Sequence, residues 1–199
     1  AVLSGYGNPL DEAASQLSLA IASKIDADCA DALQKSKLVQ DESTHIIDYD
    51  GVVNATDLFN EETQRTKVLF IHSKQLTQIR KNPDFLDKNK YPMDLMMNGA
   101  IGTIAGCEVV VSNRVKKTGD VYFNPIVKTS YDSETEEETP AITIFMKRAI
   151  MVENTRDALA GKNTPSANEH YGVALTNESK VVIVKFKATA PTPAPEGGA

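Results

Sequence analysis

The feature that most constrains the fold of this chain is a long amphipathic helix predicted near its start. Asn8 can accept a hydrogen bond from a first-turn amide as the N-cap, and Pro9 suits the first helical position. Asp11 and Glu12 place negative charge at the positive end of the helix dipole. The apolar residues that follow at spacings of three and four form one stripe: Leu10, Ala13, Ala14, Leu17, Ile21, Ile25, Cys29 and Leu33.

The predicted helix runs from Pro9 to about Lys35, so it spans roughly 40 Å at about 1.5 Å per residue. Most helices in globular proteins are about half as long. A helix of this length either runs the whole length of its domain or braces several elements at once. The chain has 199 residues, which is enough to bury a core without disulfides or metals.

The rest of the chain mixes short helices and strands without a regular βαβ repeat. Strands are expected at residues 45–49, 67–72, 107–112, 121–128, 141–147, 149–153, 171–175 and 180–186. Helices are expected at 52–60, capped by Asn54 or Thr56, and at 74–81, capped by Ser73. This mixture predicts the α+β fold class. Residues 188–199, with three prolines and two glycines, are predicted to be a flexible tail.

Charge and cysteine content exclude several function classes. The chain carries 21 Lys and Arg against 27 Asp and Glu, a formal net charge of −6. Direct binding of nucleic acid needs clustered positive charge, so it is not the expected task. Cys29 and Cys107 are predicted to be small buried apolar residues rather than a disulfide or a catalytic thiol. No apolar run approaches about 18 residues, so we expect neither a signal peptide nor a membrane span, and synthesis in a reducing cytoplasm.

Glycines and histidines give little sign of an enzyme. Gly99, Gly102 and Gly106 fit no phosphate-loop pattern and precede a strand, which favours tight turns. The three histidines lack the spacing of a metal site. His72 and Ser73 would form half of a nucleophile pair only if folding brought His170 beside them.

Charged clusters are equally ambiguous. Asp48 and Asp50 suit solvation as well as metal binding, and the acidic run 132–138 is either a solvated loop or a weak Ca²⁺ or Mg²⁺ site. Lys116 and Lys117 either dock an acidic neighbour or lie in a plain exposed loop. The sequence therefore predicts no catalytic residue, no cofactor and no metal site.

Four segments resemble the major capsid proteins of tailed bacteriophages with the HK97-like fold. Residues 8–28 resemble the family's spine helix, and residues 68–85 resemble the strand and helix of its axial-domain core. Residues 102–112, Gly-Thr-Ile-Ala-Gly-Cys-Glu-Val-Val-Val-Ser, match its glycine turn before a Val-rich strand. Residues 156–157, 169–173 and 179–182 resemble its closing strands. These matches follow the family order and cover nearly all of residues 5–187.

The resemblance implies a discontinuous peripheral domain, residues 1–37 and 147–187, and a mixed-sheet axial domain, residues 38–146, inserted between them. Such subunits form pentamers and hexamers in which axial loops meet at the symmetry centre. By position, residues 113–120 are the candidate loop, with Lys116, Lys117, Thr118, Gly119 and Asp120 as candidate interface residues. Arg156 and Asp157 either lie where neighbouring subunits meet or form a pair within the chain.

The implied function is that of a structural subunit of a phage or prophage icosahedral capsid that encloses the genome. Its partners would be copies of itself, a scaffold and a maturation protease, with packaged DNA contacted only indirectly and no membrane. It would be made in the host cytoplasm and reside in the virion. The alternatives are an encapsulin-like shell protein, an α+β enzyme or ligand-binding domain that uses His72 and Ser73, and a module that binds a different protein.

The sequence departs from the family pattern at its start. In the family, an N-terminal arm and a long extended loop precede the spine helix and wrap neighbouring subunits. The predicted helix here begins near residue 9. We therefore expect either a truncated, proteolysed or engineered fragment that keeps the fold, or a naturally short shell protein.

Overall fold

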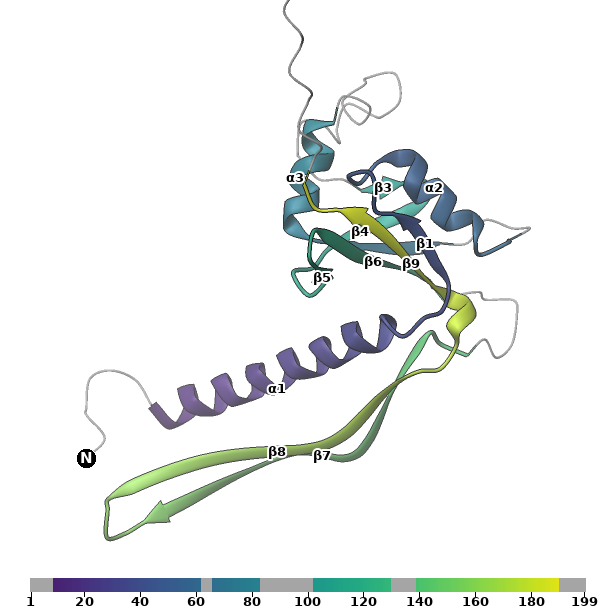
Figure 1. Ribbon diagram of the computed structural model, residues 1–199. Coiled ribbons are helices and arrows are strands. Elements are labelled where there is room, and N and C mark those ends of the chain that lie inside the picture. Colours follow the sequence, from purple (N-terminus) through teal and green to yellow (C-terminus); the bar gives the residue numbers. More distant parts are fainter. Residues whose placement is uncertain (1–8, 62–65, 83–101, 130–138, 190–199) are drawn as a thin grey trace, which may run out of the picture. The chain divides into compact units, whose positions relative to one another are not determined.

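The computed structural model describes residues 9–61, 66–82, 102–129 and 139–189 (Figure 1). The chain divides into two compact units, one made of residues 1–32 and 142–174 and the other of residues 33–141 and 175–199. None of the helices in the described segments has the length and apolar character needed to cross a membrane. The predictions for residues 84–98, Gly99, the acidic run 132–138 and residues 190–199 lie outside the described residues.

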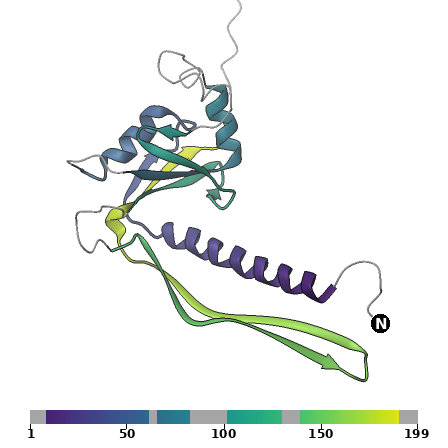
Figure 2. The same cartoon turned by 180° about the vertical axis from the view of Figure 1, so that it is seen from behind.

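The first unit combines helix α1 (Pro9–Leu33) with a long hairpin of strands β7 (Ile142–Asp157) and β8 (Lys162–Leu175). The predicted long helix is confirmed, and its 25 residues end at Leu33 instead of about Lys35. Ala13, Ala14, Leu17, Ile21 and Ile25 on its stripe are half-buried. Figure 2 shows the twisted hairpin running beside the helix, and the two strands predicted at 141–153 form one continuous strand.

The second unit is built on a seven-stranded mixed sheet in the order β1-β9-β6-β2-β4-β3, with β5 paired to β6. Its strands are β1 (Val39–Glu42), β2 (Lys67–Ile71), β3 (Thr103–Ile104), β4 (Cys107–Val111), β5 (Lys116–Thr118), β6 (Val121–Lys128) and β9 (Val181–Lys187). The pairs β1–β9 and β2–β4 are parallel, and the others are antiparallel. A short 3₁₀ helix, η1 (Glu178–Lys180), leads into β9. The α+β class is confirmed.

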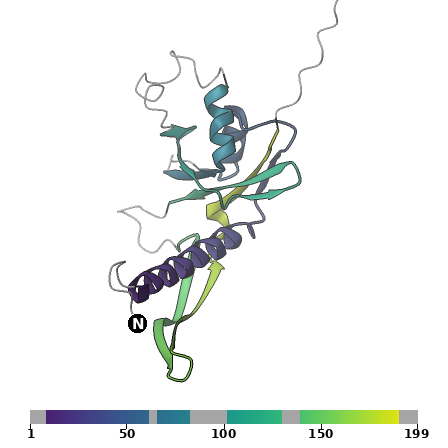
Figure 3. The same cartoon turned by 90° about the vertical axis from the view of Figure 1, so that its left-hand side faces the viewer.

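Helices α2 (Tyr49–Asp57) and α3 (Ser73–Lys81) lie on the same face of this sheet (Figures 1 and 3). Buried apolar side chains of both helices join those of the strands in one core. Its fully buried members include Val52 of α2, Ile79 of α3, Leu69 of β2, Ile126 of β6 and Phe186 of β9. The continuous apolar runs of β2 and β9 belong to interior strands of the sheet, each with a strand neighbour on both edges.

The predicted grouping of the closing strands differs from the structure. Residues 147–187 were expected to pack as one piece with the long helix, but only residues up to 174 belong to that unit. Strand β9 lies in the sheet of the other unit, between β1 and β6. The reason is its apolar run, with Val181, Val182, Ile183 and Val184 all buried. These side chains alternate between the two faces of the strand, so the run needs cover on both faces.

Two local predictions were wrong, and in both places a residue that was not predicted to be a helix cap serves as one. The strand expected at 45–49 is absent, since residues 43–48 form the turn after β1 and Asp48 caps α2 in place of Asn54 or Thr56. At α3 the cap is His72 rather than Ser73. His72 Nδ1 accepts a hydrogen bond from Lys74 N at 3.1 Å, and Gln75 Oε1 accepts from His72 N at 2.9 Å, completing a capping box.

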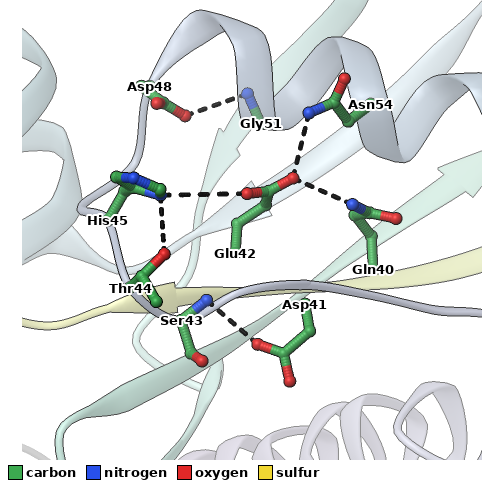
Figure 4. A network of polar contacts seen from close by, with 9 residues as sticks. All are labelled: Gln40, Asp41, Glu42, Ser43, Thr44, His45, Asp48, Gly51 and Asn54. Atoms are coloured by element: carbon green, nitrogen blue, oxygen red, sulfur yellow. Dashed lines mark hydrogen bonds and ion pairs between the residues drawn. The ribbon is translucent and has the colours of Figure 1, made fainter.

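A polar network fixes the turn between β1 and α2 (Figure 4). The Glu42 carboxylate accepts hydrogen bonds from the side-chain amides of Gln40 at 2.9 Å and Asn54 at 3.0 Å. These amide donors hold the pKa of Glu42 below its usual range despite partial burial. Because Asn54 belongs to α2, one carboxylate ties the strand to the helix.

At the start of α2, the chain approaches the core too closely for a side chain. A Cβ atom at Gly51 would lie 2.6 Å from Asp48 Oδ1 and 2.6 Å from Phe186 Cε1. Asp48 Oδ1 also accepts the capping hydrogen bond from Gly51 N at 3.0 Å. The cap and the buried ring therefore both depend on glycine at this position.

We expect Gly51→Ala to lower the free energy of unfolding by about 1–2 kcal/mol, because overpacking costs about 1–3 kcal/mol and alanine recovers up to about 1 kcal/mol of helix propensity. Chemical denaturation measures the change. Gly172→Ala is the matched control, since a Cβ there meets nothing within 4 Å. A Gly51→Ala variant as stable as Gly172→Ala would contradict the close approach.

Candidate subunit-interface surfaces

The first candidate surface is the hairpin loop that joins β5 to β6. Thr118 pairs with Val121 across the ladder, which leaves Gly119 and Asp120 as a two-residue loop. Gly119 has φ +60, and a positive φ at the first loop residue is typical of a type II′ turn. Lys116 to Asp120 are all exposed. The loop predicted at 116–120 is therefore a short strand followed by a tight turn.

The base of this loop rests on α3. The Tyr122 ring stacks on the His72 ring with centroids 5.0 Å apart, and Lys117 Nζ lies 5.3 Å from the Tyr122 centroid. Burial, together with the positive charges of Lys74 and Lys117, holds the pKa of His72 below its ordinary value. The neutral imidazole is thereby favoured, and neutral Nδ1 is what the helix cap requires.

The far side of the loop is tied to the end of β9. Asp120 O accepts a hydrogen bond from Ala188 N at 2.7 Å, and Asp120 Oδ1 accepts one from Thr189 Oγ1 at 2.8 Å. Anchored on two sides, the loop presents Lys116, Lys117 and Gly119 in a fixed exposed arrangement. Asp120 holds the loop in shape.

The second candidate surface is the tip of the β7–β8 hairpin. Asp157 Oδ1 accepts hydrogen bonds from Leu159 N at 3.0 Å and Ala160 N at 3.1 Å. Asp157 thus orders its own turn, in which Leu159 is fully exposed. Arg156 is exposed and has no ion-pair partner within the described part of the chain. The predicted pair splits into one residue that shapes the turn and one that faces solvent.

The structure adds a surface that sequence reasoning missed. Strand β7 is exposed along residues 144–157, including large apolar side chains at Ile144, Phe145, Met146, Ile150, Met151 and Val152. Exposed apolar patches of this kind mark interaction sites in soluble proteins. The sequence signal was the pair of apolar runs at 141–147 and 149–153, which predicted strands but not their exposure.

Within the first unit, one polar contact links β8 to α1. Tyr171 Oη donates a hydrogen bond to Asp28 Oδ2 at 2.6 Å, and Lys24 Nζ lies 2.6 Å from Asp28 Oδ1. The Lys24 and Tyr171 bonds lower the pKa of Asp28. The Asp28 carboxylate in turn raises the pKa of Tyr171 to about 12.

We expect Asp28→Asn to return the pKa of Tyr171 towards the usual value of about 10, because the anionic acceptor is lost. Ultraviolet titration of the phenolate, taken as the difference between each protein and its Tyr171→Phe counterpart, isolates this tyrosine. Lys24→Met, which keeps the Asp28 carboxylate, should leave a raised value. An unchanged titration in Asp28→Asn would contradict the hydrogen bond.

The residues proposed for an enzyme serve other purposes in the structure. His72 Nδ1 is the capping acceptor of α3, and Ser73 is the exposed first residue of that helix. His170 lies on β8, in the other compact unit. Asp48 caps α2, and burial raises its pKa.

The two cysteines are free. Burial raises the pKa of the Cys107 thiol to about 11. Cys29 was predicted to be buried but is only half-buried. Its pKa is raised mainly by this partial burial and further by the negative charges of Asp26 and Asp28. Neither thiol has the low pKa of a reactive cysteine.

Comparison with known proteins identifies the fold. No protein-family model matches the chain. The major capsid protein of Staphylococcus phage phiMR11 is 29% identical over 186 residues, which are 92% of this chain and 62% of that protein. The chain thus spans less than two thirds of the length of this relative.

Solved structures of phage capsids and of an encapsulin have a similar fold. The capsid structure of cyanophage P-SCSP1u matches 93% of this chain and 68% of that chain, with a TM-score of 0.72 and 9% identity. The SrpI encapsulin complex of Synechococcus elongatus matches 95% of this chain and 71% of that chain, with a TM-score of 0.55 and 10% identity. The chain is therefore a homologue of a phage major capsid protein and has the HK97-like capsid fold that the sequence resemblance predicted.

Proposed function

We propose that this chain is a structural subunit of a phage or prophage capsid and works by binding copies of itself. The observation that carries the proposal is the similarity to a phage major capsid protein along 92% of the chain. The sequence match to a phage major capsid protein supports the capsid over the encapsulin alternative. The role is structural rather than catalytic, and the site of action is the virion.

The exposed surfaces support such a role. A 16-residue strand with six exposed large apolar side chains needs a protein partner to cover it. We assign the unit of α1, β7 and β8 to the peripheral domain and the seven-stranded unit to the axial domain. In this assignment Lys116, Lys117, Thr118, Gly119 and Asp120 face the symmetry centre of a pentamer or hexamer, and Arg156 lies at a contact between subunits. Asp157 supports that contact by shaping the turn.

Self-association of the purified 199-residue chain tests the proposal. Sedimentation velocity over a range of concentrations should show assemblies of five or six copies or larger, and electron microscopy should show rings or curved sheets. Lys116→Glu should reduce assembly without lowering the melting temperature, because this side chain is exposed. A chain that stays monomeric at every concentration would contradict the proposed function.

A further inference from the structure

One side of β7 carries a charge–apolar–charge pattern. Arg148, Val152 and Arg156 are spaced four residues apart, so their side chains point to the same face of the strand. All three are exposed, and Val152 retains 53% of its surface. At about 3.3 Å per residue, successive members are about 13 Å apart.

The outer side of α1 carries the complementary pattern. Glu12, Leu19 and Asp26 are spaced seven residues apart and therefore share one stripe of the helix. All three are exposed, and Leu19 retains 67% of its surface. At about 1.5 Å per residue, successive members are about 10 Å apart. Small side chains at Ser15 and Ala22 lie between them and permit a close approach.

The two patterns carry opposite charges and are similar in length. Aligned antiparallel, Arg148 meets Asp26, Val152 meets Leu19 and Arg156 meets Glu12. The strand pattern spans about 26 Å and the helix pattern about 21 Å. Long, flexible arginine side chains absorb the difference of a few ångströms at each end.

A single chain does not bring these surfaces together. The side of α1 that is partly covered is the stripe of Ala13, Leu17, Ile21 and Ile25, whereas Leu19 stays largely exposed with the chain's own hairpin present. Val152 is also exposed in the same unit. A contact between these two surfaces would therefore have to join the strand of one copy to the helix of another.

The charges of each surface favour the contact. Helix α1 carries five carboxylates (Asp11, Glu12, Asp26, Asp28 and Asp31) against one lysine, Lys24, a net charge of 1 − 5 = −4. Its last turn has no basic residue to offset the negative end of the dipole. From residue 147 to residue 156 of β7, the charged residues are Lys147, Arg148, Glu153 and Arg156, and Glu153 is an odd number of residues from both arginines, so it lies on the opposite face of the strand. A β7 strand from a second copy would bring positive charge to this helix.

We propose that the face of β7 formed by Arg148, Val152 and Arg156 binds the outer stripe of α1, formed by Glu12, Leu19 and Asp26, on a second copy of this chain. The inference rests on the proposed self-assembly and names its contact. Each copy offers one strand and one helix, so the contact is head-to-tail and continues from copy to copy. Such contacts close into rings when the rotation per copy permits it.

Charge reversal tests the pairing. Arg148→Glu with Arg156→Glu makes both surfaces of a chain acidic, and Glu12→Lys with Asp26→Lys makes both basic. We expect each double variant alone to associate at least about tenfold more weakly than the native chain, since each pair of like charges opposes docking. An equimolar mixture of the two should regain assembly, because every contact between unlike chains again joins opposite charges.

Asp57→Lys with Lys74→Glu is the matched control, because it reverses two exposed charges of the other unit. It should assemble as the native chain does. In a Cys29→Ser background, Leu19→Cys and Val152→Cys chains should form a disulfide when mixed and none when separate. If neither reversal weakens assembly, or if the mixed cysteine variants form no cross-link, the contact is overturned and the proposed function still stands. A native chain that never assembles overturns both.

Discussion

Replacing Glu61 by alanine is expected to lower the free energy of unfolding by about 3–5 kcal/mol, because it removes a largely buried carboxylate that pairs with two lysines. Glu61 Oε2 lies 2.7 Å from Lys67 Nζ, and Glu61 Oε1 lies 2.5 Å from Lys128 Nζ. The Lys67 and Glu61 side chains are only 8% and 10% exposed. Lys67 and Lys128 are also partners across the β2–β6 ladder, so one carboxylate neutralises two cations at the same point of the sheet.

Chemical denaturation of Glu61→Ala beside Lys185→Ala provides the measurement and its control. Lys185 Nζ lies 3.3 Å from Asp41 Oδ2 in a more exposed pair, whose loss should cost at most about 1 kcal/mol. Equal losses in the two variants would show that the Glu61 cluster is no more than a surface ion pair.

The Glu61 cluster also sets a pH dependence. Burial acts to raise the pKa of Glu61, but the hydrogen bonds and charges of Lys128 and Lys67 outweigh it and hold the pKa below the ordinary value. The stabilisation is therefore fully present above the ordinary glutamate pKa and is lost as the pH falls through the lowered value in the folded state. The native chain should lose more stability than Glu61→Ala over that acid range.

The second large effect is expected at Asn124, which forms a buried amide pair with Gln75. Asn124 Nδ2 donates to Gln75 Oε1 at 2.7 Å and to Phe70 O at 2.8 Å, and Gln75 Nε2 donates to Asn124 Oδ1 at 2.9 Å. Both residues are fully buried. We expect Asn124→Leu to cost about 2–4 kcal/mol, because it leaves buried polar groups on α3 and β2 without their partners.

A double-mutant cycle with Gln75→Leu separates this pairing from simple packing. If the two amides stabilise each other, the double variant should lose less than the sum of the single losses, since removing both partners leaves fewer unpaired groups. Strict additivity would contradict the reciprocal hydrogen bonds. His72→Ala provides a further comparison, because Gln75 Oε1 also accepts the His72 backbone amide and that bond remains in the variant.

Features encoded by local periodicity were predictable from the sequence. The stripe from Ala13 to Leu33 fixed the helix α1, and the apolar runs at 67–72 and 121–128 gave strands β2 and β6. Local hydrogen bonding was harder. Histidine is an uncommon cap, so the cap of α3 was assigned to Ser73, although His72 supplies it through Nδ1.

Features decided by distant partners were not predictable. Strand β1 has the polar sequence Val-Gln-Asp-Glu, and it is a strand only because β9 lies beside it in parallel. The exposure of Ile150 and Val152 depends on what covers β7, which periodicity does not report. The anchoring of the candidate loop, residues 113–120, to Ala188 and Thr189 through Asp120 is a long-range contact that local sequence does not report.

The position of β9 has a consequence for the order of events during synthesis. Its residue Lys185 contacts Asp41 of β1 across 144 positions of sequence, and β9 separates β1 from β6 in the sheet. A nascent chain that has reached residue 180 holds both flanking strands but lacks the one that joins them. Pairing across such a distance is slow because a long loop must close first. A ribosome-bound chain therefore cannot finish this sheet until residue 187 has emerged, although α1, β7 and β8 of the other unit are already synthesised.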